Sequence, residues 1–269
     1  MTTEDNRQQM QSPSYRLPAL DQDFLLGDSM RGVRFLLEYA KAEEALRDWG
    51  VRSTIVVFGT ARARPLENAP EDEAFSERER KQLARRARWY EEARRFGRIA
   101  SERGGAMEDG DGQRDNVIAT GGGPGIMEAA NRGAFEAGAP SIGFNITLQH
   151  EQEPNAYSTP ELTFRFHYFA MRKMHLAMRA NALVVFPGGF GTLDELFELL
   201  TLQQTQKAPR LPVVLYDESY WRSIINFNAL AEEGTISPHD LELFEFAESA
   251  EEIWDKLVAS GLRLPSQSP

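Results

Sequence analysis

The sequence contains no cysteine in its 269 residues. This absence excludes disulfide bonds, thiolate metal sites and thiol nucleophiles together. Long apolar runs are lacking as well, because no stretch approaches the roughly 18–20 apolar residues that a membrane span needs. The polar N-terminus has no apolar segment of the kind that a secretory signal contains. From the sequence we therefore expect a cytoplasmic protein with no membrane partner.

Basic residues are outnumbered, with 30 Lys and Arg against 41 Asp and Glu and a net charge of −11. A nucleic-acid partner is usually held by a broad basic surface, so this balance argues against one. Hydrophobic residues make up 41% of the chain and charged residues 26%, which is ordinary for a folded globular protein. The composition thus excludes a wholly disordered chain.

The chain divides into four segments by composition. Residues 1–20 are polar and predict a flexible tail. Apolar residues recur at helical spacing from Ser29 to Trp49, which predicts a helical extension over residues 21–50 that packs on another surface. Residues 51–262 show no second hydrophobic pattern and no Gly/Ser linker, so we expect a single domain there. Residues 263–269 form a short tail.

Short β-branched runs alternate with helical patterns along the domain. Strands are predicted at residues 54–58, 116–119, 141–145, 162–166, 182–186, 212–216 and near Phe244. Helices are predicted at residues 81–103, 126–137, 170–180, 192–206, 220–232 and 250–260. Strands that are apolar on both faces and alternate with helices indicate an α/β fold, with a doubly wound, mostly parallel sheet of about seven strands.

Three of the strand-to-helix turns carry glycine, at Gly59 to Arg62, at Gly121 to Gly125 and at Gly188 to Thr192. Such turns lie at the carboxyl edge of a parallel sheet, where glycine and a helix N-terminus together suit a phosphate. The alternative is that the glycines only tighten the turns. No Walker A motif occurs, and the third glycine of a dinucleotide fingerprint would fall on Ile126 or Glu128, so NAD is not favoured.

Candidate chemistry lies at Arg172 and Glu195. Glu195 follows the third glycine loop, where a carboxylate can activate water or stabilise a cationic sugar centre. An alternative is a capping box, in which Thr192 and Glu195 satisfy each other's backbone donors. Arg172 and Lys173 are adjacent and point in different directions on a helix. They are either a solvated helix end or, for Arg172, a planar fork that holds a phosphate or orients Glu195.

The four histidines are His150, His167, His175 and His239. They lack the spacing of metal ligands, so we expect packing or surface roles and no metal site. A pyridoxal phosphate enzyme would need a lysine for its Schiff base. Lys173 is the only lysine near the motifs, so lysine decarboxylase chemistry is not favoured and no organic cofactor is expected.

Met171-Arg172-Lys173, followed by Pro187-Gly-Gly-Phe-Gly-Thr-Leu-Asp-Glu195, resembles the signature of the LOG ("lonely guy") family. The segments Gly121 to Gly133 and Val57 to Arg62 look like two earlier motifs of that family, in the usual order. The resemblance implies a modified Rossmann fold and hydrolysis of the N-glycosidic bond of a purine nucleoside 5′-monophosphate. AMP or an N6-modified cytokinin riboside monophosphate would yield free base and ribose 5-phosphate.

The resemblance also implies roles for particular residues. Arg172 and Glu195 would be the catalytic pair. The other residues expected to contact the nucleotide, from the glycine loops or by motif position, are Gly59, Thr60, Gly121, Gly122, Gly123, Gly125, Glu151, Lys173, Gly188, Gly189, Phe190, Gly191, Thr192, Leu193, Asp194 and Thr201. Family members form homodimers or larger homo-oligomers, so a second copy of the chain is an implied partner.

Two features depart from the short members of the family. This chain has Gly125-Ile-Met-Glu128 where they have Gly-Leu-Met-Gly, and it has an N-terminal extension of about 50 residues. Both are more similar to the longer bacterial branch, which includes AMP nucleosidase-type proteins. The extension has two candidate roles, covering the sheet edge or building a subunit contact. The alternative function is a non-catalytic carrier of a nucleotide or of the molybdenum cofactor, with the same fold.

Overall fold

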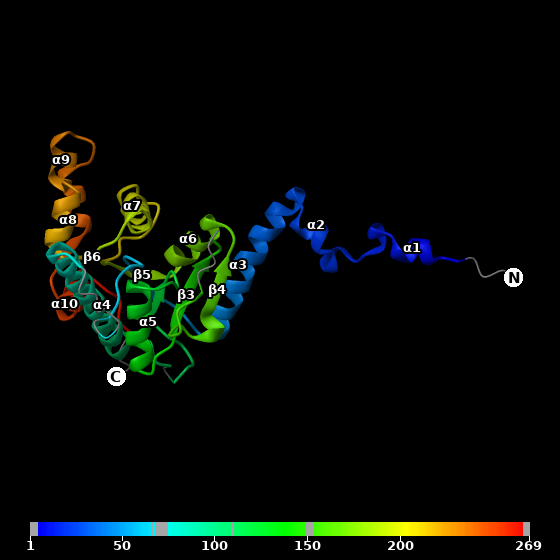
Figure 1. The fold of residues 1–269 in the computed structure, drawn as a ribbon, viewed down its shortest axis with the longest axis horizontal. Helices are drawn as coiled ribbons and strands as arrows, with labels where there is room; N and C mark the ends of the chain where they lie inside the picture. Colours follow the sequence, from blue (N-terminus) through cyan, green and yellow to red (C-terminus); the bar gives the residue numbers. More distant parts are fainter. Residues whose placement is uncertain (1–4, 66, 68–74, 109, 149–152, 266–269) are drawn as a thin grey trace.

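Seven strands form one sheet in the computed structural model, which describes residues 5–65, 67, 75–108, 110–148 and 153–265. The strands are β1 (Thr54–Phe58), β2 (Val117–Thr120), β3 (Ser141–Ile146), β4 (Thr163–Phe166), β5 (Ala180–Val185), β6 (Val213–Tyr216) and β7 (Glu245–Ala247). Their order is β4-β3-β2-β1-β5-β6-β7, and each neighbouring pair is parallel. Figure 1 shows this sheet between its helices. The predicted fold class is confirmed.

Helices cover both faces of the sheet. One face carries α3 (Arg31–Asp48), α6 (Phe169–Met178), α7 (Phe190–Gln204), α8 (Glu218–Ile224) and α9 (Phe227–Glu232). The other face carries α4 (Glu77–Arg103), α5 (Ile126–Glu136) and α10 (Ala250–Ala259). Because side chains alternate along a strand, β1 sends Val56 and Phe58 to the first layer and Ile55 and Val57 to the second.

Two helices differ most from their predicted bounds. The predicted helix over 220–232 is two helices, because Ile225 is extended and the side chain of Asn226 accepts from Ala229 N to start α9. Helix α4 begins at Glu77 rather than residue 81, since Ser76 and Glu79 form a capping box. The sequence also predicts an exposed, acidic loop over residues 65–79, part of which lies outside the described residues.

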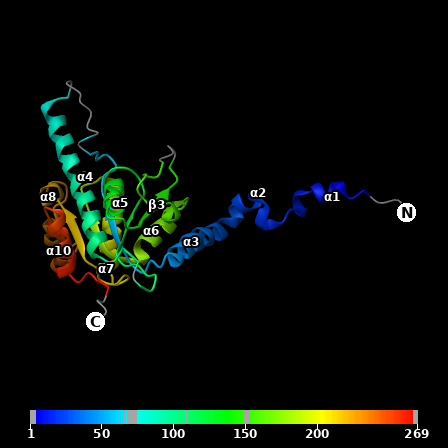
Figure 2. The ribbon, with the colours of Figure 1, turned by 90° about the horizontal axis from the view of Figure 1, so that it is seen from below.

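The chain before the sheet projects away from the rest of the molecule, as Figures 1 and 2 both show. It consists of short elements that lead into α3: α1 (Arg7–Gln11), η1 (Pro13–Tyr15), η2 (Pro18–Leu20), α2 (Gln22–Leu26) and η3 (Asp28–Met30). No residue from 5 to 41 is buried. No helix in the described part of the chain is both long and apolar enough to cross a membrane.

The strand order reverses between β1 and β5, which are neighbours although three strands separate them in sequence. Ligands bind doubly wound sheets at such a switch point, outside the carboxyl ends of the strands. The loops after β1 and β5 are joined there, since Thr60 N donates to Pro187 O at 2.9 Å. The fold therefore brings the first and third glycine loops together.

Candidate active site

A pocket of about 560 Å³ opens at the carboxyl edge of the sheet beside this switch point. All three glycine loops contribute to it. Of the residues predicted from sequence, its wall contains Gly59, Thr60, Gly121, Gly123, Arg172, Gly189, Phe190, Gly191, Thr192 and Glu195. The structure thus gathers residues that lie far apart in the sequence into one cavity.

The glycines of the loops have two different structural roles. Gly125 has φ +77°, and a Cβ there would lie 2.3 Å from the carbonyl oxygen of Thr60. This glycine lets two loops pack closely, which agrees with the alternative that the glycines tighten the turns. At Gly189 and Gly191, by contrast, a Cβ would meet nothing within 4 Å. The third loop therefore leaves its backbone open to a ligand.

Helix α7 begins at Phe190 with Gly189 as its N-cap, and no side chain caps it. The capping box proposed for Thr192 and Glu195 is therefore wrong, because Thr192 already lies inside the first turn. The first N–H groups of a helix lack partners within the helix. Here Phe190 and Gly191 line the pocket. Uncapped N–H groups at a helix start form an anion site, and a phosphate suits it.

Arg172 and Glu195 form a buried ion pair at the wall of this pocket. Arg172 lies in the first turns of α6, Glu195 lies on α7, and Nη2 of the arginine donates to Oε1 of the glutamate at 2.8 Å. Their side chains are 14% and 6% exposed. The guanidinium also lies 5.3 Å from the ring centroid of Phe169. Arg172 is therefore no solvated helix end but holds the carboxylate in one position.

Burial raises the pKa of Glu195 above its ordinary value of 4.5, although the charge and hydrogen bond of Arg172 lower it in part. Desolvation penalises the ionised carboxylate, while the guanidinium favours it. A carboxylate with a raised pKa beside a pocket is suited to proton transfer or to stabilising positive charge.

Two donors at the pocket have no protein partner among the described residues. They are Nε of Arg172 and Nδ2 of Asn145, both buried from solvent. A buried donor without an acceptor costs free energy, so such groups are commonly completed by a ligand or water. Both residues line the pocket, and an oxygen-rich ligand would supply the missing acceptors.

Lys173 points away from the pocket, as its position next to Arg172 predicts. Its Nζ lies 2.8 Å from Asp194 Oδ2 and 3.0 Å from Glu198 Oε2. Burial alone would lower the pKa of Lys173, but its hydrogen bonds with these carboxylates raise it overall. Lys173 is therefore held as a cation in an ion-pair cluster on α7, which is a poor arrangement for a Schiff base.

Other predicted contacts lie outside the pocket wall. Leu193, Asp194 and Thr201 lie with Lys173 on a shallower surface beside it. Gly122, Gly125 and Gly188 shape the loops without lining the pocket. Glu151 falls outside the described residues. The wall also contains residues that were not predicted as contacts, of which the first four lie within the predicted motifs: Phe58, Ala61, Arg62, Met127, Asn145, Ile146 and Leu148.

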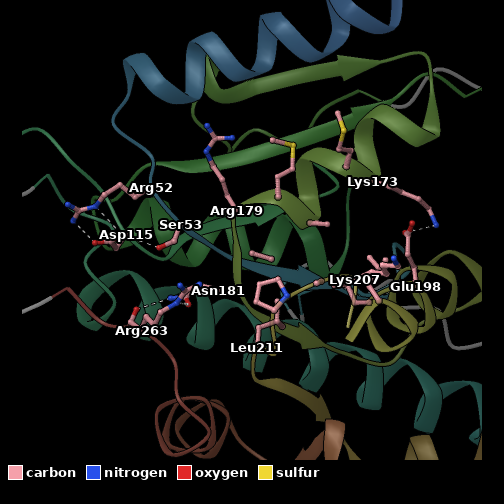
Figure 3. Close-up of a pocket in the computed structure, with 18 of the residues that line it drawn as sticks. Arg52, Ser53, Asp115, Lys173, Arg179, Asn181, Glu198, Lys207, Leu211 and Arg263 are labelled. Atoms are coloured by element: carbon pink, nitrogen blue, oxygen red, sulfur yellow. Dashed lines mark hydrogen bonds and ion pairs between the residues drawn. The ribbon is translucent and has the colours of Figure 1, made fainter. Parts of the chain in front are cut away.

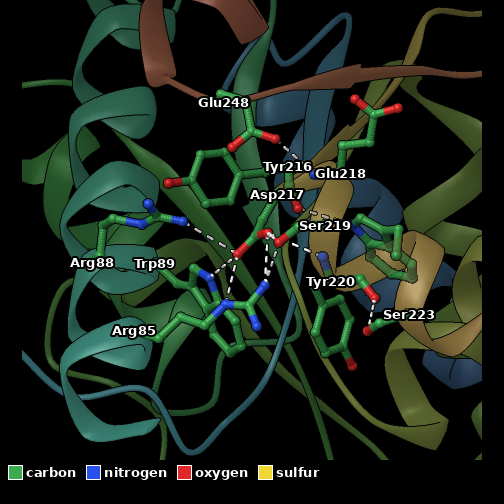
Figure 4. A network of polar contacts seen from close by, with 11 residues as sticks. Arg85, Arg88, Trp89, Tyr216, Asp217, Glu218, Ser219, Tyr220, Ser223 and Glu248 are labelled. Atoms are coloured by element: carbon green, nitrogen blue, oxygen red, sulfur yellow. Dashed lines mark hydrogen bonds and ion pairs between the residues drawn. The ribbon is translucent and has the colours of Figure 1, made fainter. Parts of the chain in front are cut away.

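A polar network behind the third glycine loop was also missed from sequence. Tyr220 of α8 donates its hydroxyl to Gly188 O at 2.6 Å. The backbone N–H of Tyr220 donates to Asp217, which has no exposed surface and also accepts from Arg85 and Trp89 (Figure 4). This network supports the loop at Gly188, and Arg85, Trp89, Asp217 and Tyr220 themselves do not line the pocket. Its members come from α4, β6 and α8, and no local pattern links them.

The histidines carry no metal site in the described part of the chain, where no group of three or more potential ligands lies close together. His175 is buried among aromatic rings, stacked on Tyr39 at 5.6 Å between centroids, and burial lowers its pKa. Its packing role agrees with the sequence prediction.

Fold and site together define a Rossmann-like α/β protein with a pocket suited to a phosphorylated ligand. A sequence model for the family described as "Possible lysine decarboxylase" matches residues 127–257. A rice protein (Oryza sativa subsp. japonica), probable cytokinin riboside 5′-monophosphate phosphoribohydrolase LOGL3, is 29% identical over 164 residues, 55% of this chain and 74% of that protein. Cytokinin riboside 5′-monophosphate phosphoribohydrolase LOG1 of Arabidopsis thaliana is 29% identical over 145 residues, 53% and 67% of the two chains. The resemblance to the LOG family is confirmed.

Among solved structures, the molybdenum cofactor binding protein of the phototrophic bacterium Rippkaea orientalis is similar, with a TM-score of 0.48 and 18% sequence identity. The match covers 77% of this chain and 97% of that chain.

Proposed function

We propose that this protein hydrolyses the N-glycosidic bond of a purine nucleoside 5′-monophosphate, either AMP or an N6-modified cytokinin riboside monophosphate. Free base and ribose 5-phosphate are the products. The observation that carries the proposal is the buried Arg172–Glu195 ion pair at the wall of a pocket built from three glycine loops. The names of the similar plant proteins, which are phosphoribohydrolases, support the same reaction class.

Each part of the pocket has a role in this reaction. The phosphate is bound by the open N–H groups at the start of α7 and by the neighbouring Gly121 to Gly125 turn. As the bond between C1′ and the base breaks, positive charge develops on the sugar, and the ionised Glu195 stabilises it or activates the attacking water. Arg172 positions Glu195 and leaves Nε free for an oxygen of the substrate. The proposal needs no metal and no organic cofactor.

The test is incubation of the purified protein with AMP, CMP, GMP, IMP and isopentenyladenosine monophosphate, with free base measured by chromatography. We expect base from a purine substrate. In Glu195→Gln, turnover should fall about 10²- to 10⁴-fold, because a carboxylate in this role contributes by that factor. Glu161→Gln changes an exposed carboxylate in η5 (Pro160–Leu162) and serves as the matched control.

Near-normal turnover in Glu195→Gln would remove the proposed role of that residue. Tight nucleotide binding with no base released by the unchanged protein would instead favour the carrier function. A cytoplasmic location and a homo-oligomeric state are further parts of the proposal. A nucleotide substrate is in keeping with the first, and the resemblance to the LOG family implies the second.

A further inference from the structure

Asn145 is a side chain of the active pocket that has no partner among the described residues. It lies near the carboxyl end of β3, and its Nδ2 is buried without an acceptor. The amide packs closely against Gly122, where an added Cβ would lie 2.7 Å from Oδ1. Because Gly122 also has φ +70°, a side chain is disfavoured there on both grounds. The second glycine loop therefore leaves a space that the amide of Asn145 fills.

Another asparagine shows how the fold uses a buried amide. Asn181 lines a pocket of about 700 Å³ at the amino ends of β1 and β5 (Figure 3). Its Nδ2 donates to Asn116 Oδ1 at 2.6 Å and to Arg263 O at 2.8 Å. Its Oδ1 accepts from Nε of Arg263 at 3.0 Å. Both ends of that amide serve the fold, whereas the amide of Asn145 is left for a ligand.

Asn145 and the start of α7 belong to different ends of the active pocket. The third glycine loop and α7 follow β5, whereas Asn145 lies on β3, and β2 and β1 lie between these two strands. Neighbouring strands are about 4.8 Å apart, so β3 and β5 are separated by about 14 Å. A phosphate at the start of α7 therefore leaves Asn145 to a different part of the nucleotide.

The wall around Asn145 suits a nucleobase. Ile146 and Leu148 follow it along the same wall, and Met127 lies against the second glycine loop. The part of the wall that residues 145–148 contribute contains no cation. An apolar surface with one well-placed polar group is typical of sites that bind a flat organic ring and fix its orientation.

The catalytic pair lies next to this wall. An added Cβ at Gly121 would lie 3.9 Å from Nη1 of Arg172, and the next residue, Gly122, is the one against which Asn145 packs. With C1′ of the ribose beside Glu195 and the phosphate at the start of α7, the base extends towards Asn145. Phosphate, ribose and base then follow one another along the pocket from α7 to β3.

An asparagine amide matches one edge of adenine. Nδ2 donates to N7 of the ring, and Oδ1 accepts from the 6-amino group, as in the pairing of asparagine with adenine in nucleic-acid recognition. Guanine and hypoxanthine carry an oxygen at position 6, which accepts a hydrogen bond and does not donate one. They therefore cannot make both bonds to the same amide.

We infer that Asn145 determines the base specificity of the pocket, by binding N7 and the 6-amino group of adenine. The pocket then prefers an adenine nucleotide to one of hypoxanthine or guanine. This role rests on the proposed function, for which it names the base. Its test is a ratio between two substrates of one protein, which a general loss of stability would not change.

The experiment measures kcat/KM for AMP and for IMP with the full-length protein. The unchanged protein should prefer AMP. In Asn145→Leu, which keeps a similar side-chain size without donor or acceptor, the ratio of AMP to IMP should fall about tenfold or more, because a bidentate asparagine contact discriminates by about that factor. Asn6→Leu changes an exposed asparagine that does not line the pocket, and this matched control should keep the ratio.

A second variant separates the two ends of the amide and does not depend on the folding of Asn145→Leu. Asn145→Asp keeps an acceptor for the 6-amino group but has no donor for N7. The rates with AMP and IMP should therefore both fall, while the preference for AMP remains. Loss of that preference in Asn145→Asp would overturn the pairing of Oδ1 with the 6-amino group.

Ribose 5-phosphate, which has no base, distinguishes a contact with the base from one with the rest of the nucleotide. Its inhibition constant should be unchanged in Asn145→Leu. An inhibition constant that rises as much as kcat/KM for AMP falls would assign Asn145 to the phosphate or the ribose, and would overturn the inference.

The proposed reaction and the role of Asn145 can fail separately. If the unchanged protein releases base but Asn145→Leu keeps its ratio of AMP to IMP, only the role of Asn145 is wrong. If no base is released, the reaction is wrong, and the dissociation constants of AMP and IMP then test Asn145 with the same expected ratios. Equal affinity of the unchanged protein for the two nucleotides, or binding of neither, would overturn the inference.

Discussion

At the scale of single residues, the chemistry of the site depends on two opposing effects on Glu195. Burial raises the pKa of its carboxyl group, and Arg172 lowers it at a hydrogen-bond distance of 2.8 Å. The carboxylate is thus costly to ionise but held in one orientation. Its function is expected to require the ionised form, so the pH dependence of activity reports on both effects.

We predict that the acid limb of the kcat/KM profile lies above pH 4.5, the ordinary value for a glutamate. In Arg172→Gln the cation that lowers the pKa of Glu195 is lost, so this limb should move to higher pH, and kcat should fall about 10²-fold or more. Arg172→Lys keeps the charge and should shift the limb less. A profile that does not move in Arg172→Gln would exclude electrostatic coupling between the two side chains.

A second residue-scale prediction concerns Asp217 and stability. Burial alone would raise the pKa of Asp217, but hydrogen bonds from Arg85, Ser219 and Trp89 lower it from 3.8 to about 2. Between pH 2 and pH 3.8 the unfolded chain therefore binds more protons than the folded chain does. The stabilisation is present above pH 3.8 and is lost as the pH falls toward 2, and it amounts to about 2 kcal/mol at about 1.4 kcal/mol per pKa unit.

Asp217→Asn should therefore lower the free energy of unfolding by about 2 kcal/mol at pH 7. At pH 3 the difference in the free energy of unfolding between Asp217→Asn and the unchanged protein should be about 1 kcal/mol smaller, because part of the stabilisation from the lowered pKa of Asp217 is lost at that pH. Urea unfolding at the two pH values measures this. Glu218→Gln, which changes the next carboxylate along the chain, should stay within about 0.5 kcal/mol at both. Equal differences in the free energy of unfolding at pH 7 and pH 3 would contradict the prediction.

At the scale of the elements, the third glycine loop is held between two helices. Helix α7 starts from the loop, and Tyr220 of α8 donates to the carbonyl oxygen of Gly188 within it. Asp217 caps α8 and so positions Tyr220. The loop that offers its N–H groups to the pocket is therefore supported at Gly188, which keeps these groups in place without a side-chain cap.

We predict that Tyr220→Phe raises KM roughly tenfold and lowers kcat less. The loop would bind the phosphate equally in the ground state and the transition state, so a loop that loses its support weakens both complexes alike. The free energy of unfolding should fall by about 1 kcal/mol for the lost hydrogen bond. Steady-state kinetics with the preferred nucleotide check this. Ser223→Ala removes another hydroxyl of α8 and should leave KM unchanged. A stability loss with no change in KM would mean that Tyr220 is only structural.

At the scale of the whole molecule, the two hydrophobic layers share one sheet. Each central strand contributes to both, as β1 does with Val56 in one layer and Val57 in the other. Loss of the sheet would therefore expose both layers at once. We propose that residues 51–262 unfold as a single cooperative unit.

This predicts that near-ultraviolet and far-ultraviolet circular dichroism show coincident urea transitions. The measurement uses the full chain, with Leu257→Ala in one layer and Leu215→Ala in the other. Each should lower the midpoint of the whole transition, since deletion of a buried leucine costs about 2–5 kcal/mol. Two separated transitions, moved independently by the two substitutions, would show two units.

Much of this architecture follows from local pattern. The strands at residues 54–58 and 141–145 were predicted nearly to their observed ends, because a β-branched run that ends at Gly59 and a short apolar segment that follows Pro140 are both strand signals. The Arg172–Glu195 pair was predicted through its motifs. The predicted helix over 220–232 was wrong because one extended residue, Ile225, interrupts a pattern that is otherwise helical.

The sequence by itself determined the fold class and the three glycine loops, since each follows from local patterns, and it proposed the candidate catalytic pair from two short motifs. The tertiary structure alone decided that Glu195 meets Arg172 rather than a helix cap, that Asn145 joins the pocket, and that Tyr220 supports Gly188. It also left large apolar side chains of residues 5–37 exposed. These outcomes depend on packing between distant elements, which local periodicity and propensity do not encode.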